Sequence, residues 1–141
     1  MHARCSPGAR YGRWHGWAHN FPSAYLAALL TSAAQPPSAT TPQLANAAWR
    51  GDELIGFASL GLVTPDVREI GVLVTDAWQH HGIGTALLEA LAAQARQLGI
   101  TTLRAEMLAE DAELVRVLRR LGPVRSTTSH DVVTARVLLS A

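Results

Sequence analysis

The sequence contains no lysine and only one cysteine, Cys5. A single cysteine cannot form an internal disulfide or a thiolate metal cluster, so a reducing, cytoplasmic location is expected. Without lysine, the chain cannot contain the Gly-Lys-Ser/Thr phosphate loop of ATP-binding enzymes. The longest apolar run near the N-terminus, Tyr25–Leu30, is far too short to span a bilayer, so no membrane association is expected.

Charged residues are also scarce: they make up 16% of the chain, and the net charge is +1. So small a net charge argues against nucleic acid or acidic membranes as partners. Trp14, Trp17 and Trp49 are interpreted as packing residues, because no basic groove accompanies them. With 141 residues, 48% of them hydrophobic, the chain is expected to form one domain, residues 1–141, around a buried core.

The chain divides near residue 45 into a part with weak signals and a part with clear ones. In residues 1–45 we predict one short helix, Ser23–Ala33, and a proline-rich loop over residues 33–43. Residues 46–141 contain the regular patterns: strands are predicted at Ala47–Trp49, Leu54–Leu62, Val67–Val74, Thr102–Leu108, Val124–Thr128 and Val132–Leu139, and helices at Thr85–Leu98 and Asp111–Leu121. This β-β-β-α-β-α-β-β order predicts an α/β (α+β) fold with a mixed sheet flanked by helices.

The segment Gln79–Thr85, QHHGIGT, joins a predicted strand to a predicted helix and is the most distinctive in the chain. The N–H groups at the start of a helix attract anions, and Gly82 and Gly84 let the backbone approach a bulky group closely. A phosphate or diphosphate site is therefore favoured over a plain turn. A metal site is disfavoured because His80 and His81 lack a third ligand at helical spacing. A dinucleotide fingerprint would need a third glycine where Leu87 stands.

The pattern Gln79-x-x-Gly82-x-Gly84 after a valine-rich strand resembles the acyl-coenzyme A loop, Q/R-x-x-G-x-G/A, of the GNAT N-acetyltransferase superfamily. A helix and a strand follow, and then EDAELVRVLRRLGP, which is similar to the second motif of that family. The resemblance covers about Trp49 to Leu139. Within it, LRAEMLAEDAELVRVLRRLG looks like the protein-lysine acetyltransferase branch of the family.

This resemblance implies a mostly antiparallel GNAT-like sheet and an enzyme that uses acetyl-CoA as co-substrate, with no metal. It implies that main-chain groups of Leu73 and Val74 bind the pantetheine arm. It also implies that the loop holds the diphosphate, through Gln79, His80, His81, Gly82, Ile83, Gly84 and Thr85.

The reaction implied is direct transfer of the acetyl group to a primary amine, either a protein lysine or a small molecule. Glu69, ten positions before Gln79, is the candidate general base, and Glu106 is the reserve candidate. Alternatively, Glu69 is an ordinary strand carboxylate paired with Arg68 or Arg104. Many relatives have a tyrosine as general acid where this sequence has Leu118.

The family core begins with a strand that the first residues, MHAR, do not resemble, so either this sequence begins after the strand or the strand is absent. Together with the absent tyrosine, this leaves open a second function, a non-catalytic acyl-CoA-binding or sensor domain. The sequence does not choose between acceptors, and it leaves a homodimer open as the form of assembly.

Overall fold

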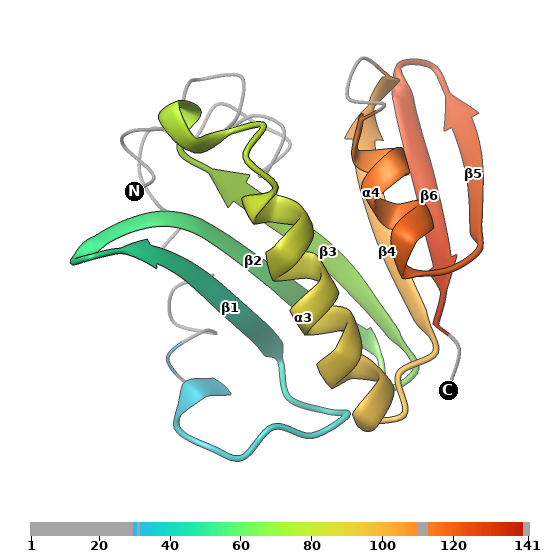
Figure 1. Cartoon of the computed structure of the whole chain (residues 1–141). Helices are drawn as coiled ribbons and strands as arrows, with labels where there is room; N and C mark the ends of the chain where they lie inside the picture. The colour runs from blue at the N-terminus through green and yellow to red at the C-terminus, as the bar shows by residue number, and fades with distance from the viewer. Residues whose placement is uncertain (1–29, 31, 110–112, 140–141) are drawn as a thin grey trace.

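The computed structural model describes residue 30, residues 32–109 and residues 113–139. In this part of the chain the elements follow the predicted order (Figure 1). They are β1 (Gln43–Arg50), β2 (Glu53–Thr64), β3 (Val67–Val74), the 3-10 helix η2 (Asp76–Trp78), α3 (Ile83–Gln97), β4 (Thr102–Leu108), α4 (Glu113–Leu121), β5 (Val124–Ser129) and β6 (Val132–Leu138).

The strands form one six-stranded sheet in the order β1-β2-β3-β4-β6-β5. All neighbouring strands are antiparallel except β3 and β4, which are parallel because α3 crosses between them. The predicted α/β (α+β) class with a mixed, mostly antiparallel sheet is therefore confirmed. The start of the chain, which bears on the family's first strand, lies outside the described residues. So do the predicted short helix up to residue 29 and Asp111, the predicted first residue of the second helix.

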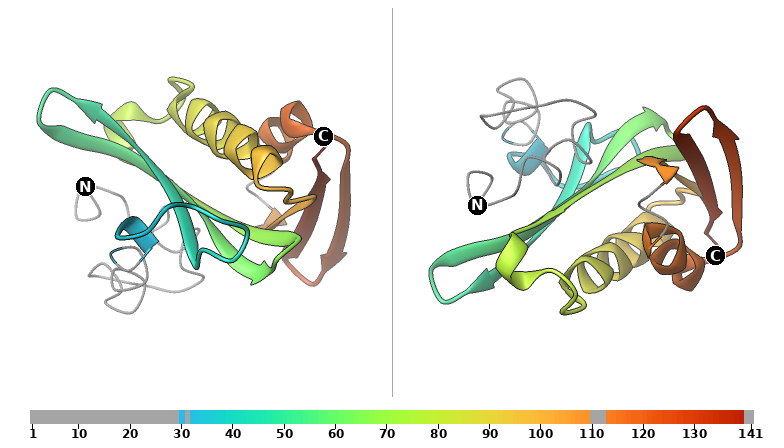
Figure 2. Two further views of the ribbon diagram at one scale, coloured as in Figure 1. Left: turned by 90° about the horizontal axis from the view of Figure 1, so that it is seen from below. Right: turned by 90° about the horizontal axis from the view of Figure 1, so that it is seen from above.

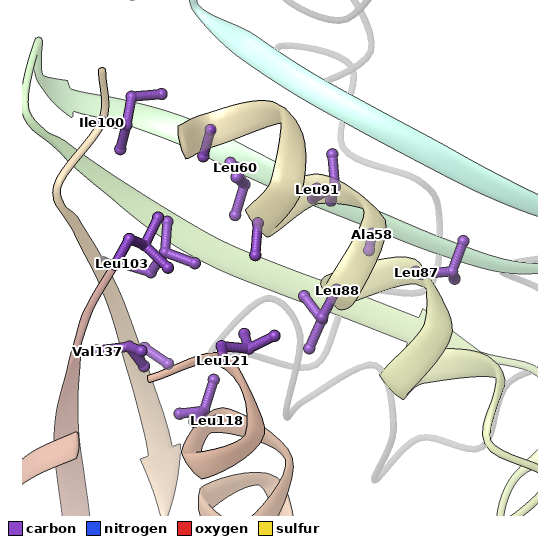
Figure 3. Packing of buried hydrophobic residues seen from close by; sticks show 14 of the residues in the cluster. Ala58, Leu60, Leu87, Leu88, Leu91, Ile100, Leu103, Leu118, Leu121 and Val137 are labelled. Atoms are coloured by element: carbon purple, nitrogen blue, oxygen red, sulfur yellow. The ribbon is translucent and has the colours of Figure 1, made fainter. Parts of the chain in front are cut away.

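Both α3 and α4 pack on the same face of the sheet (Figure 2). The apolar stripe of α3 lies against β2, and α4 closes the core over β4 and β6, as Figure 3 shows. The fully buried side chains on this face include Leu60, Leu88, Leu91, Leu103, Leu118 and Val137. Side chains at alternate positions of the strands point to the opposite face of the sheet, away from both helices.

Two predicted boundaries were wrong. Strand β1 begins at Gln43, earlier than the predicted Ala47 and at the end of the predicted proline-rich loop, because its main chain pairs with β2 from Gly61 onward. Helix α3 begins at Ile83 and not at Thr85, because Gly82 takes a left-handed conformation (φ 78°) and acts as its N-cap. Trp49, interpreted as a packing residue, is 61% exposed.

Arg68 is a fully buried arginine on β3. Its guanidinium donates hydrogen bonds to four main-chain carbonyls, those of Ser38, Ala39, Thr41 and Leu60. Burial lowers the pKa of Arg68, since a low-dielectric surrounding disfavours the charged form. The four carbonyl dipoles offset this cost, and they fix the segment before β1 against the sheet.

The turn after α4 contains a glycine that the packing requires. A Cβ added at Gly122 would lie 2.2 Å from the carbonyl oxygen of Leu138. We expect Gly122→Ala to lower the free energy of unfolding by about 3 kcal/mol, because main chain must move to relieve the clash. Gly51→Ala is the control: nothing lies within 4 Å of its Cβ position, so only the left-handed φ of 57° is penalised, at about 1 kcal/mol. Urea denaturation of both variants measures the difference, and equal losses would contradict the assignment.

In the described part of the chain, no helix is both long and apolar enough to cross a membrane.

Candidate active site

The loop predicted to bind a diphosphate is held in place by its own first residue. The Gln79 side-chain amide donates to the Val74 carbonyl at 3.2 Å and to the Asp76 carboxylate at 3.3 Å. These two bonds connect the loop to the end of β3 on one side and to η2 on the other. Gln79 therefore shapes the loop, and its side-chain amide nitrogen is engaged within the protein.

The next residues turn the main chain sharply twice. His80 has φ 62° and Gly82 has φ 78°, so the left-handed region is visited at two of three consecutive positions. Such a conformation is uncommon for a residue with a Cβ, and in the described part of the chain His130, in the turn between β5 and β6, also adopts it (φ 55°). Alternation of this kind gathers successive N–H groups into a concave anion-binding arrangement.

The N-cap residue of helix α3 leaves the N–H groups of the first turn without a side-chain cap. This residue is Gly82, which has no side chain to accept a hydrogen bond, and no acidic residue lies in the first turn. The Ala86 N–H donates to the Gly82 carbonyl at 3.0 Å, so the N–H groups of Ile83, Gly84 and Thr85 precede the regular helical bonds. With the positive end of the helix dipole, these groups fit an anion.

Gly84 lies at the contact between α3 and β3. A Cβ at this position would lie 3.6 Å from Val72 Cγ2 and 3.8 Å from Val74 Cγ2, which are ordinary van der Waals distances. The packing of the chain itself therefore tolerates alanine at position 84. This fits a glycine whose missing side chain leaves room for something outside the chain.

Strands β3 and β4 pair over only three positions, Val67 with Thr102, Arg68 with Leu103 and Glu69 with Arg104. Both strands continue, to Val74 and Leu108, but they diverge, as Figure 1 shows. We call the last pair, Glu69 and Arg104, the fork. Beyond the fork, one side of β3 has no neighbouring strand in the described part of the chain.

The main chain of β3 alternates between its two sides. The Thr75 N–H donates to the Ile55 carbonyl at 2.9 Å, and Leu73, two residues earlier, stands opposite Phe57. Hydrogen-bonded pairs recur every second residue in an antiparallel ladder, so Leu73 directs its N–H and C=O toward β2. Val72 and Val74 direct theirs toward the side that β4 has left. Of the two predicted pantetheine-binding residues, Val74 thus faces that side with its main chain, while Leu73 is buried. Val72 was not predicted.

The two candidate bases share one arginine at the fork. The Arg104 guanidinium donates to the Glu106 carboxylate at 2.7 Å and lies 3.7 Å from the Glu69 carboxylate. Glu69 and Glu106 retain 36% and 33% of their side-chain exposure. Of the two expected pairings of Glu69, the one with Arg104 is present, whereas Arg68 is buried on the other face. Within the described part of the chain, Glu106 accepts a hydrogen bond whereas Glu69 has only the longer ion pair, so Glu69 is the freer carboxylate.

One of the two loop histidines packs against a tryptophan, which also contacts an arginine. His81 stacks at a tilt on Trp78, with ring centroids 5.6 Å apart, and the Arg50 guanidinium lies 4.8 Å from the centroid of the Trp78 ring. Over residues 32–109 and 113–139, no three histidine, cysteine or acidic side chains come together as metal ligands would. The contact of Arg50, the last residue of β1, with Trp78, the last residue of η2, was missed, because it joins residues that lie far apart in the sequence.

The position of the family's tyrosine is occupied by Leu118, which is 0% exposed in the core under α4. A leucine side chain has no proton to donate, and this one is buried, so position 118 cannot supply the general acid.

The sequence matches the acetyltransferase (GNAT) family over residues 10–122. The chain belongs to this family. The predicted enzyme class, an acetyl-CoA-dependent N-acetyltransferase, is thereby confirmed, and an amine is the acceptor group of such an enzyme. The match begins at residue 10, so it includes part of the N-terminal region whose pattern was weak.

Solved structures of the same fold include the GNAT domain of S. lividans PAT, with 23% identity, a TM-score of 0.78, and coverage of 98% of this chain and 81% of that one. The putative acetyltransferase yncA from Salmonella typhimurium, solved with its cofactor acetyl-CoA, has 18% identity, a TM-score of 0.67, and coverage of 100% and 91%. The PaiA N-acetyltransferase from Thermoplasma acidophilum in complex with coenzyme A has 16% identity, a TM-score of 0.68, and coverage of 92% and 87%.

Proposed function

We propose that this acetyltransferase moves the acetyl group of acetyl-CoA directly to a primary amine, either a protein lysine or a small-molecule amine. One observation carries the proposal. The uncapped start of α3 and the fork at Glu69 lie at the two ends of the diverging part of β3. Acetyl-CoA is a long thioester with a diphosphate far from its acetyl group. In this arrangement the start of α3 would bind the diphosphate, the open side of β3 would follow the connecting arm, and the acetyl group would lie near the Glu69 carboxylate.

In this proposal, the main-chain N–H groups of Gln79–Thr85 bind the diphosphate, and the pantetheine arm runs along Val72–Val74 toward the fork. The acetyl-CoA and coenzyme A complexes of the Salmonella and Thermoplasma proteins support this use of the fold. The first turn of α3 contains no acidic residue that would repel the phosphates. No part of this assignment involves a metal ion.

At the fork, the acceptor amine arrives as an ammonium and must lose a proton before it can react. Glu69 accepts that proton, directly or through a water molecule. The nitrogen lone pair then attacks the thioester carbon, and a main-chain N–H on the open side of β3 stabilises the oxyanion. When the carbon–sulfur bond breaks, the attacking nitrogen releases its second proton to water, so that the product is the neutral N-acetylated amine, and coenzyme A departs as the thiolate. Because Leu118 cannot donate a proton, water protonates the thiolate.

The rival function is that of a non-catalytic acyl-CoA-binding domain, in which the loop binds CoA but no acetyl transfer takes place beside Glu69. A panel of lysine peptides and small amines, incubated with acetyl-CoA and monitored by release of free thiol, separates the two. Acetylation of at least one amine class, confirmed by a mass increase of the product, is the expected result. Tight CoA binding with no transfer to any amine would favour the sensor.

The family match extends into the N-terminal region. We therefore also infer that residues 1–141 form one acetyltransferase domain, with residues 1–45 and the β5–β6 pair on the acceptor side. A cytoplasmic location and a homodimer remain part of the proposal, and size-exclusion chromatography with light scattering tests the latter.

A further inference from the structure

Three arginines stand in one line across three neighbouring strands. Arg104 on β4 is directly opposite Arg136 on β6, and Arg136 is directly opposite Arg125 on β5. Directly opposed residues of antiparallel strands point to the same face of the sheet. We call these three residues the arginine row.

The arginine row lies on the face that carries Glu69. Arg104 is the partner of Glu69 at the fork, and its neighbours along β4, Leu103 and Ala105, are buried in the core on the helix side. The row therefore begins at the proposed base and runs away from it, over β6 to β5, on the face turned away from α3 and α4.

The charges along this row are unevenly compensated. Glu69 and Glu106 both lie against Arg104, whereas the guanidinium groups of Arg125 and Arg136 form no ion pair or hydrogen bond in the described part of the chain, and both residues are exposed. Like charges directly opposite each other destabilise a sheet. Two adjacent free guanidinium groups beside a reaction centre suit an anionic partner that neutralises both.

We propose that the arginine row binds an acidic segment of a peptide acceptor, and this inference rests on the proposed acetyl transfer at Glu69. Neighbouring strands are about 4.8 Å apart, so β6 lies about 10 Å and β5 about 14 Å from the strand of Glu69. An extended peptide advances about 3.3 Å per residue, so these spacings correspond to acidic side chains about three and four residues from the acceptor amine. The carboxylate of a free amino acid, two bonds from its amine, does not span this distance.

The test uses nine-residue peptides with blocked ends, a central lysine, and glutamates three and four residues after it. The comparison peptides carry glutamines at these two positions. In a second pair of peptides, the two glutamates or the two glutamines stand three and four residues before the lysine. A third pair has no lysine and a free N-terminal amine. We expect kcat/KM for the better glutamate peptide to exceed that of its glutamine counterpart about five- to tenfold at low ionic strength, mainly through KM, and the ratio to shrink with added salt.

The double variant Arg125→Gln/Arg136→Gln should bring this ratio close to one. Arg119→Gln is the matched control, because Arg119 is an exposed arginine on α4, on the other side of the sheet, and should preserve the ratio. Removing opposed like charges should leave the melting temperature of the double variant unchanged or raised, whereas a structural role for the row predicts a lower one.

Acetylation of lysine or N-terminal peptides without an acidic preference would overturn the inference and leave the proposed function intact. So would a preference that survives in the double variant. If no peptide is acetylated, the proposed function fails for peptides. Fluorescence anisotropy of the same labelled peptides with the CoA-saturated protein then decides the inference, because equal affinities for the glutamate and glutamine peptides would overturn it.

Discussion

Replacing Glu69 by glutamine is expected to lower kcat by about 100-fold or more, with the dissociation constant of CoA unchanged. Glutamine preserves the size of the side chain but cannot accept a proton from the ammonium form of the acceptor. CoA affinity is expected to be retained because the proposed diphosphate site is at the far end of β3. Initial rates of thiol release at saturating amine, together with calorimetric titration of CoA, measure the two quantities separately. Raising the pH should partly restore the rate of the variant, since more of the free amine is then already deprotonated.

Two control variants make this result specific. Glu89→Gln removes an exposed carboxylate of α3, which pairs with Arg120 at 3.3 Å, and should leave kcat unchanged. Glu106→Gln weakens the hydrogen bond to Arg104, and we expect a smaller loss than at Glu69. A larger loss at Glu106 would transfer the base role to that residue, and full activity of Glu69→Gln would exclude Glu69 as the base.

Replacing Gly82 by alanine is expected to weaken CoA binding about tenfold. A Cβ in the left-handed conformation costs about 1–2 kcal/mol, and an exposed loop relaxes to avoid that cost, which moves the N–H groups at the start of α3. Nothing in the chain lies within 4 Å of the added Cβ, so a steric clash within the protein is not the cause. Gly82→Asn should recover most of the affinity, because asparagine tolerates this conformation. Calorimetric titration of CoA checks both variants.

Gly99→Ala is a closely matched control for this experiment. Gly99 follows the other end of α3, has φ 79°, and also has nothing within 4 Å of its Cβ position. The backbone penalty is therefore the same in both variants, but only position 82 belongs to the proposed anion site. Equal losses of CoA affinity in the two variants would show that general destabilisation, and not the loop, causes the effect.

The geometry of the candidate loop could be predicted because it is local in the chain. The glycines of Gln79–Thr85, next to a strand and a helix, indicate a sharp turn into a helix N-terminus without any long-range contact. The alternation of Val67–Val74 likewise indicated which side chains face the core. The second motif alone indicated that Leu118 stands where many relatives have the general-acid tyrosine. The burial of Leu118 agrees with the absence of a proton donor at this position.

What could not be predicted depends on strand pairing between distant residues. The register of β4, β6 and β5 places Arg104, Arg136 and Arg125 in one line, although they are 11 or more positions apart in the sequence. Similarly, no local pattern shows that pairing between β3 and β4 stops after Glu69, or that Arg68 is buried among carbonyls. The alternation of main-chain hydrogen bonds, which directs Val72 toward the open side, also becomes visible only with the register.

Calorimetric titration of CoA beside pantetheine tests the central claim most directly, because pantetheine lacks the diphosphate that the N–H groups of Gln79–Thr85 are proposed to bind. We predict that CoA binds and that pantetheine binds at least about 100-fold more weakly, since charge-assisted bonds to an anion at a helix N-terminus supply most of the affinity. No measurable affinity of the folded protein for CoA, or equal affinities for the two ligands, would contradict the account.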